Sequence, residues 1–457
     1  MAHGRLTMTA QPQVSAELFD PSGTNVVEQL RSRVTGDLLD VVVDLDSGTG
    51  CRMRDLRDGT EYLDMTMYFS SAPLGHGHPG LRTPEFEAEL VRAARTKPAN
   101  PDFATVQQAR FVDTLRRVFG DPALPWLFLI EGGGPAVENA LKVAFDWKTK
   151  YNARRGVAVR GCRAMHLEWA FHGRTGYTMS LTNTDPRKVR DYPKFDWPRV
   201  PSPAVDPGSE DWERAELLPS ERHALDAAEA AFTRYGDEVA CFVYEPVQGE
   251  GGDRHLRPAF LREMQRMCRE QGVLTIADEV QSGGGLTGYP WAHQALGLEP
   301  DLVAFGKRLQ VCGVLGGRRV DEIPDNAFRE PSRISSTWGG SLVDMVRATR
   351  ILEVVEEERL LEHASRMGEL LLSELRGLAA EFPGLVSAAR GRGLMAAVDF
   401  PDANTRDRVV DLVRRRHRTI FLPCGPRSLR WRPALSVRPE ELTDAVVALR
   451  KTLSELD

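Results

Sequence analysis

Short apolar runs that alternate with helix-like segments constrain the fold of this chain more than any other feature. Runs of strand length lie at 126–130, 239–244, 274–277 and 302–305, and helix-like segments such as 136–148 and 259–271 lie between them. Parallel neighbouring strands need a crossover connection, and a helix usually provides it. The alternation therefore predicts an α/β fold with a mostly parallel sheet.

The sequence predicts three regions, namely an N-terminal region, a large domain that contains this core and one long excursion, and a C-terminal small domain. Residues 1–85 mix turn residues with short strand-like pieces such as 38–45, and we expect an N-terminal arm and part of a small domain there. Residues 183–222 are rich in Pro, Asp and Trp without clear periodicity, and they predict a long excursion at the surface or an interface. The other expected parts are a large domain at 86–342 and a C-terminal small domain at 343–457, with helices ending at 357 and spanning 360–382, a strand at 394–400 and a helical end.

The composition argues against several classes of protein. A hydrophobic content of 42% and a charged content of 27% are typical of an ordered globular protein. The net charge of −6 gives no general attraction to nucleic acid or to an anionic membrane, and the basic run 414–418 fits the outer face of a helix. No stretch approaches the roughly 18 apolar residues of a membrane span. We therefore expect a cytoplasmic protein without nucleic-acid or membrane partners.

The cysteines and histidines do not predict a disulfide framework or a metal site. The six cysteines are scattered, at 51, 162, 241, 268, 312 and 424, without a Cys-x-x-Cys pair, so we expect reduced thiols. His76 and His78 have no third ligand at a useful spacing. The simpler interpretation is that these two histidines lie in a turn or an interface, so we expect no metal site.

Lys307 and Asp278 predict a catalytic site at the ends of two strand-like runs. Lys307 closely follows the run at 302–305, and Asp278 directly follows the run at 274–277. Each alone has a simpler interpretation, because acids at strand ends often cap helices and a lysine beside an arginine is often a solvated charge. Together they can place an amine and a carboxylate on opposite edges of one planar cofactor. Pyridoxal phosphate needs both, the lysine for a Schiff base with its aldehyde and the carboxylate to keep its ring nitrogen protonated.

A glycine-rich turn upstream predicts a seat for the phosphate of that cofactor. Gly132, Gly133 and Gly134 follow the run at 126–130 and precede a helix-like segment. Backbone amides and the helix dipole attract an anion at such a place, although a glycine-rich turn alone is more often only a turn. A second stretch, 283–288, has dinucleotide-binding spacing, but Tyr-Pro rather than a helix follows it, so we do not interpret it as a nicotinamide site.

Several strings occur in the order in which class III (omega) aminotransferases carry their cofactor motifs. They are Tyr-Glu-Pro at 244–246, Ala-Asp-Glu-Val-Gln at 277–281, Pro-Asp-Leu-Val-Ala-Phe-Gly-Lys at 300–307 and Ser-Thr-Trp-Gly-Gly at 336–340. On these strings the chain resembles that family of pyridoxal-phosphate enzymes from near residue 40 to near residue 438. The resemblance implies an α/β fold of the fold-type I transferases, with a mostly parallel sheet in a large domain and a smaller α+β lobe.

The resemblance also implies roles for single residues. Phe171 matches the aromatic residue that stacks on the cofactor ring, and Gln281 matches a residue near its phenolic oxygen. Thr337 matches a residue that reaches the phosphate from the neighbouring subunit, which implies a homodimer with shared active sites. The family commonly has Ser and Glu around the phosphate turn where this chain has Gly132, Gly134 and Pro135, so backbone amides must do more here. Lys307 matches the Schiff-base lysine of the family, and Asp278 matches the partner of the ring nitrogen. Gly133 and Gly134 match the phosphate-binding turn.

Three further matches concern the substrates. Arg174 matches the arginine that binds a distal carboxylate, and Arg430 the arginine that binds the α-carboxylate of the 2-oxoglutarate/glutamate pair. Glu250 matches an acid that can neutralise Arg430 while a terminal amine donor reacts. Longer strings at 171–177, 193–198, 248–255 and 310–314 resemble family members that act on L-lysine. The resemblance thus implies transfer of the ε-amino group of L-lysine to 2-oxoglutarate, giving 2-aminoadipate 6-semialdehyde and L-glutamate.

Other functions stay open from the sequence. Arg308 and Leu309 depart from the pattern of the lysine enzymes directly after Lys307, so the donor could be ornithine, 4-aminobutyrate or a diamine. A mutase or decarboxylase of related fold is a further alternative. The alternative from a different class is a non-catalytic binding protein with this fold.

Overall fold

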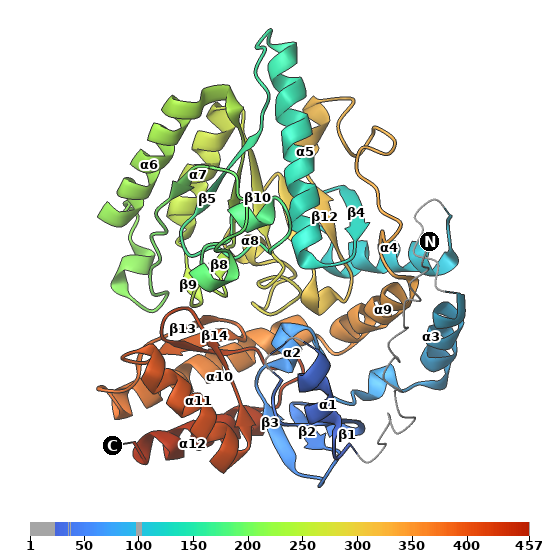
Figure 1. The fold of residues 1–457 in the computed structure, drawn as a ribbon, viewed down its shortest axis with the longest axis vertical. Helices are drawn as coiled ribbons and strands as arrows, with labels where there is room; N and C mark the ends of the chain where they lie inside the picture. The colour runs from blue at the N-terminus through green and yellow to red at the C-terminus, as the bar shows by residue number, and fades with distance from the viewer. Residues whose placement is uncertain (1–22, 35, 37, 97–102, 457) are drawn as a thin grey trace, which may run out of the picture.

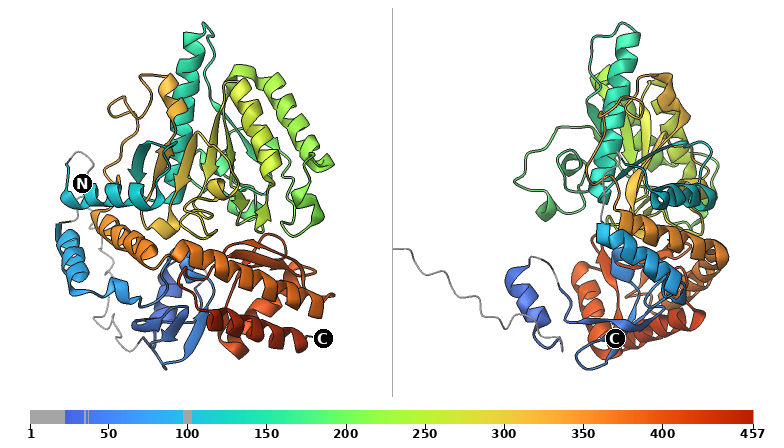
Figure 2. Two further views of the ribbon diagram at one scale, coloured as in Figure 1. Left: turned by 180° about the vertical axis from the view of Figure 1, so that it is seen from behind. Right: turned by 90° about the vertical axis from the view of Figure 1, so that its right-hand side faces the viewer.

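The computed structural model describes residues 23–34, 36, 38–96 and 103–456. Figure 1 shows two parts, one built around a large sheet and one in which the N-terminal strands lie beside the C-terminal helices. Figure 2 shows that helix α1 (Val26–Arg33) stands away from the rest of the molecule. The N-terminal arm predicted from the sequence lies largely outside the described residues.

The large sheet has seven strands within the described residues. Every neighbouring pair from β11 to β6 is parallel, whereas β12 is antiparallel to both of its neighbours. The predicted mostly parallel sheet is therefore confirmed. The strand order is β4 (Trp126–Ile130), β12 (Cys312–Gly316), β11 (Leu302–Phe305), β10 (Leu274–Asp278), β7 (Val239–Tyr244), β5 (Arg163–Leu167) and β6 (Arg199–Val200).

Helices pack on both faces of this sheet because its central strands are apolar on both faces. Cys241 of β7 packs in one core cluster with helix α5 (Gly133–Arg154), and the next residue, Phe242, packs in the other with helix α7 (Pro258–Glu270). The remaining elements of this part are α4 (Val106–Phe119), α6 (Pro219–Tyr235), α8 (Ala292–Ala295) and the ribbon of β8 (Val247–Gln248) and β9 (Arg254–His255).

The second part contains two four-stranded sheets. One has the order β1 (Val43–Thr49), β2 (Arg52–Asp55), β3 (Glu61–Asp64) and β15 (Thr419–Ile420). The other has the order β13 (Ser387–Arg392), β14 (Met395–Asp399), β17 (Ser428–Trp431) and β16 (Leu422–Cys424). The helices on and around them are α2 (Met67–Ser70), α3 (Pro84–Thr96), α9 (Leu342–Glu357), α10 (Leu360–Glu381), α11 (Ala403–His417) and α12 (Pro439–Ser454).

The C-terminal strand β15 pairs in parallel with β3, so segments from the two ends of the chain share one sheet. The predicted helical C-terminus was incomplete, because three short strands, β15 to β17, lie between α11 and α12. The segment 183–222, predicted as an excursion, also supplies β6 at the sheet edge. The division at residues 85 and 342 stays a prediction.

No helix among the described residues is long and apolar enough to cross a membrane. Over the same residues, no three His, Cys, Asp or Glu side chains gather in a way that could hold a metal ion. The six cysteines are free thiols.

Candidate active site

Lys307 and Asp278 come together because their strands are neighbours in the sheet. Strand β10 ends at Asp278, which is in register with Ala304 of the parallel strand β11. Lys307 opens the 3-10 helix η6 (Lys307–Leu309), directly beyond β11. Both side chains therefore lie at the carboxyl edge of the sheet, where ligands commonly bind in open α/β folds.

The backbone of Lys307 has a φ of 45°, in the left-handed region that non-glycine residues rarely adopt. Strain of this kind costs about 1 to 3 kcal/mol and persists where the surroundings hold the residue in place, often at functional sites. Burial, followed by the nearby charges of Arg430 and Arg432, lowers the pKa of the Lys307 amine to about 8. At mildly alkaline pH a large fraction of this amine is neutral, as a nucleophile or base requires.

Asp278 is held by two hydrogen bonds and is only 4% exposed. Its Oδ1 accepts from the backbone N–H of Val280 at 3.0 Å, and its Oδ2 lies 2.8 Å from Nδ1 of His172. His172 is also buried, and its Nε2 has no hydrogen-bond partner among the described residues. No role for His172 is predicted from the sequence, although it lies between Phe171 and Gly173 in the string 171–177.

The predicted phosphate seat is the N-terminus of the 22-residue helix α5. Gly132 precedes the helix with a φ of 92°, and no side chain caps the first turn. A Cβ on Gly133 would lie 2.7 Å from Val280, and a Cβ on Gly134 would lie 3.7 Å from the Cα of Gly173. The uncapped helix N-terminus thus lies beside the segments that carry Asp278 and His172, and backbone amides at such a place suit a phosphate group.

Phe171 is positioned through Glu245, a residue to which the sequence assigned no role. The backbone N–H of Phe171 donates to Oε1 of Glu245 at 2.9 Å, and the N–H of Gly249 donates to Oε2 at 3.1 Å. Burial, and after it the charge of Asp278, holds the pKa of Glu245 well above its ordinary value. Gln281 lies nearby, since a Cβ on Gly249 would be 2.8 Å from its Oε1.

The predicted pair of Glu250 and Arg430 is present. Oε2 of Glu250 lies 3.0 Å from Nη2 of Arg430, which is on strand β17 and 4% exposed. The other carboxylate oxygen, Oε1, accepts a hydrogen bond from Nζ of Lys188 at 2.5 Å. Burial raises the pKa of Glu250, but Arg430 and Lys188 outweigh it, so its pKa lies below the ordinary value and it stays ionised. Lys188 was not predicted as a site residue.

Arg174 and Thr337 are both exposed. Within the described residues, neither side chain has a hydrogen bond or an ion pair. The backbone nitrogen of Arg174 would lie 4.0 Å from a Cβ on Gly134, so this arginine starts beside the phosphate seat. Their roles stay predictions.

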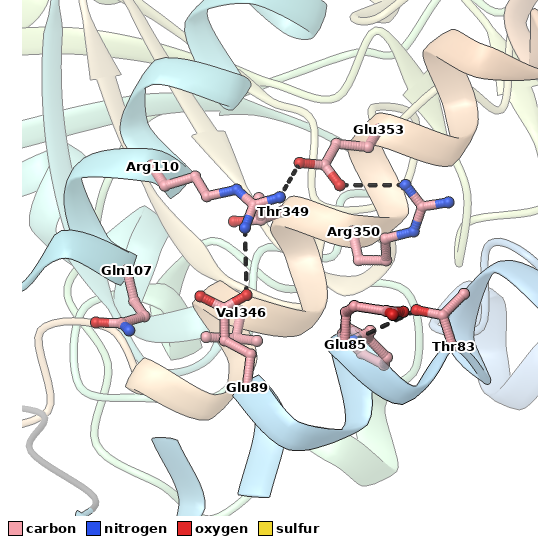
Figure 3. A pocket seen from close by; sticks show the side chains of 10 residues that line it. Thr83, Glu85, Glu89, Gln107, Arg110, Val346, Thr349, Arg350 and Glu353 are labelled. Atoms are coloured by element: carbon pink, nitrogen blue, oxygen red, sulfur yellow. Dashed lines mark hydrogen bonds and ion pairs between the residues drawn. The ribbon is translucent and has the colours of Figure 1, made fainter. Parts of the chain in front are cut away.

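The site offers what pyridoxal phosphate needs in its surroundings. It has an amine with a lowered pKa at Lys307, a fixed carboxylate at Asp278 and an uncapped helix N-terminus for a phosphate. The pocket in Figure 3 is a different place, lined by residues of α3, α4 and α9. Its two arginines, Arg110 and Arg350, already pair with carboxylates, so it adds nothing to this site.

Comparison with known proteins agrees with this geometry. The family model for class III aminotransferases matches residues 36–453. An L-lysine-epsilon aminotransferase of Amycolatopsis lactamdurans is 51% identical over 95% of this chain and 96% of its own length. A protein of the same name from Streptomyces clavuligerus is 49% identical, covering 94% of each chain. A solved lysine aminotransferase from M. tuberculosis, in the internal aldimine form, has a TM-score of 0.90 and 48% identity, covering 95% of this chain and 99% of that one.

The chain belongs to the class III aminotransferase family. The resemblance seen in its motifs is thereby confirmed, together with the fold class and the assignment as an aminotransferase.

Proposed function

We propose that this protein is a pyridoxal-phosphate enzyme that transfers the ε-amino group of L-lysine to 2-oxoglutarate. The products would be 2-aminoadipate 6-semialdehyde and L-glutamate. The observation that carries the proposal is the ion pair of Glu250 and Arg430, 3.0 Å apart, whose charges also act on the pKa of Lys307. The L-lysine-epsilon aminotransferases that share about half of its residues support the choice of donor.

The cofactor would be held by residues at the carboxyl edge of the large sheet. Lys307 would take the aldehyde and Asp278 the ring nitrogen, while the amides of Gly133 and Gly134 would bind the phosphate. When bound, pyridoxal phosphate supplies an aldehyde that accepts the amino group and a ring that withdraws electrons from the reacting carbon. Two further residues would complete the site around the ring, Phe171 on its face and Gln281 near its phenolic oxygen.

Lys307 would move the proton in each half-reaction. The Nζ of Lys307 would act as the general base that takes the proton from the carbon bearing the amino group, and then as the general acid that gives a proton back. A pKa of about 8 suits this exchange, since both the neutral and the charged amine are then accessible near the working pH. The Asp278 carboxyl group is held in place by the Val280 amide, which donates to its Oδ1 at 3.0 Å, and by Nδ1 of His172, 2.8 Å from its Oδ2, so it would be oriented toward the ring nitrogen.

The two substrates make different demands on Arg430. The ε-carbon of lysine carries no carboxylate, so an unpaired guanidinium beside it would be a buried, uncompensated charge. Glu250 supplies the missing carboxylate in that half-reaction, and Arg174 would bind the α-carboxylate of lysine at the far end. When glutamate or 2-oxoglutarate enters, Glu250 would release Arg430 to bind the α-carboxylate in a charge-assisted, forked geometry.

Thr337 would act from the other subunit. Its side chain is exposed at the end of an irregular segment, which suits a contact with the phosphate seat of a second copy. We therefore propose a homodimer in which the partner's Thr337 completes each site. A cytoplasmic location is part of the same proposal.

A panel of amino donors with 2-oxoglutarate tests this function. L-lysine, ornithine, 4-aminobutyrate and a diamine are compared by kcat/KM, and the lysine product is identified by its cyclisation. Lysine should exceed each rival by at least about tenfold, the size of a difference of about 1.4 kcal/mol. A higher value for another donor would assign the enzyme to that donor. Absence of any cofactor absorbance would instead favour a non-catalytic binding protein.

A further inference from the structure

Lys188 is a cation of the candidate site that the sequence did not predict. It ends the 3-10 helix η3 (Pro186–Lys188), in the segment predicted as a surface excursion. Its side chain is 27% exposed, and its Nζ lies 5.3 Å from the centre of the Phe171 ring, within the range of a cation–π contact. A lysine held by an aromatic ring on one side and a carboxylate on the other occupies a fixed place in the site.

Lys188 and Arg430 divide the Glu250 carboxylate between them. Arg430 contacts Oε2 at 3.0 Å, and Lys188 contacts Oε1 at 2.5 Å. The three side chains together carry two positive charges and one negative charge. The net charge of these three side chains is therefore +1, and one further carboxylate would neutralise it.

We infer that Lys188 is a positioning residue that receives Glu250 when a dicarboxylate substrate takes Arg430. In that state the substrate carboxylate pairs with Arg430 and Glu250 pairs with Lys188, so each anion has one cation. Without Lys188, Glu250 would leave Arg430 for a partly buried place with no cation, and its release would be opposed. Lys188 would thus favour glutamate and 2-oxoglutarate selectively, while the lysine half-reaction keeps the Glu250–Arg430 pair.

This inference rests on the proposed function for the role of Glu250, but its test can fail separately. Lys188→Met removes the ammonium and keeps most of the apolar stem. Lys188→Arg keeps a cation, and Arg190→Met removes an exposed cation from the same segment without touching Glu250. The binding of glutarate, a dicarboxylate that cannot react, is measured by calorimetry on the holoenzyme. The two half-reactions are then followed by single-turnover absorbance.

Lys188→Met should weaken glutarate binding and slow the glutamate half-reaction by about three- to tenfold, the value of a partly exposed charge-assisted hydrogen bond. The lysine half-reaction should change by less than about twofold, Lys188→Arg should restore most of the loss, and Arg190→Met should behave as the wild type. Equal losses in both half-reactions, or no loss in glutarate binding, would overturn the inference.

A double-mutant cycle separates an action through Glu250 from direct contact with the substrate. In a Glu250→Gln background the further change Lys188→Met should have less than about a twofold effect on glutarate binding, because the pair it serves is already absent. A full effect in that background would mean that Lys188 binds the substrate carboxylate itself, and the inference would be wrong. If wild-type enzyme does not accept lysine, the proposed donor is wrong, while the glutarate measurements still decide the role of Lys188.

Discussion

Nδ1 of His172 and Oδ2 of Asp278 lie 2.8 Å apart, and both side chains are buried. A carboxylate only accepts hydrogen bonds, so a proton on Nδ1 of His172 would complete this pair. With the Val280 amide on the other oxygen, Asp278 is fixed from two sides. The carboxylate proposed to face the cofactor therefore has its orientation set by its neighbours before the cofactor binds.

Removing His172 should loosen Asp278 without removing its charge. We expect His172→Ala to lower the single-turnover rate by about tenfold, since one of two orienting hydrogen bonds is lost. His172→Asn, which retains a donor, should recover part of the rate. A wild-type rate in the His172→Ala variant would show that the Val280 amide alone is enough to orient Asp278.

Asp278→Asn should leave the fold intact and slow proton abstraction by about 100-fold or more, because a neutral amide cannot keep the ring nitrogen protonated. The rate is measured by single-turnover absorbance with lysine and, separately, with glutamate. Circular dichroism serves as the control for folding. A wild-type rate in either half-reaction would remove Asp278 from its proposed role.

Borohydride reduction of the yellow holoenzyme should attach the cofactor irreversibly to Lys307. Lys307→Ala should not be labelled, whereas Lys142→Ala, which removes an exposed lysine of α5, should be labelled like the wild type. Peptide mapping by mass spectrometry locates the label. A label on any other lysine would contradict the assignment.

Glu250→Ala should separate the two half-reactions. It leaves Arg430 buried without its carboxylate while lysine is bound, and losing such a partner costs about 2 to 5 kcal/mol. We expect the lysine half-reaction to slow by more than about tenfold and the glutamate half-reaction to be largely spared. Equal losses in both directions would indicate a purely structural role for Glu250.

His166 should make stability fall in mild acid. Burial, followed by the charges of Arg199 and His172, lowers its pKa to about 3, and Nε of Arg199 donates to its Nε2 at 3.3 Å. Between the unfolded pKa near 6.5 and the folded pKa, only the unfolded chain binds this proton, so stability falls as pH falls. The loss from pH 7 to pH 5 should be about 2 kcal/mol. Urea unfolding at both pH values checks it, and His166→Gln should show a smaller loss than the wild type.

Sequence reasoning succeeded where the local pattern determines the structure. The strands at 126–130, 239–244 and 302–305 have the predicted bounds. A short continuous apolar run of this length is typical of a buried strand in the core of a sheet. The placement of Lys307 and Asp278 followed from the same runs. Helix α5 begins at Gly133 and ends at Arg154, beyond both predicted limits, because Gly133, Gly134 and Pro135 form its first turn and mostly polar residues continue it after Lys148.

The missed features depend on contacts between distant segments. Lys188 meets Glu250 only because η3 folds back over Phe171, and nothing around residue 188 indicates this. Strands β15 to β17 are 2 to 4 residues long, too short for an alternating pattern to be visible. His172 could have been found, because a histidine next to a recognised aromatic residue is a candidate partner for a buried carboxylate.

The pairing of β15 with β3 has a consequence for how the chain is made. During synthesis the N-terminal strands leave the ribosome long before Thr419 and Ile420 are made. The edge of β3 that pairs with β15 therefore stays unpaired while the large sheet forms. The sheet of β1, β2 and β3 can gain its fourth strand, β15, only near the end of translation. A chain cut short before residue 419 would therefore contain all seven strands of the large sheet but leave β3 with an unpaired, aggregation-prone edge.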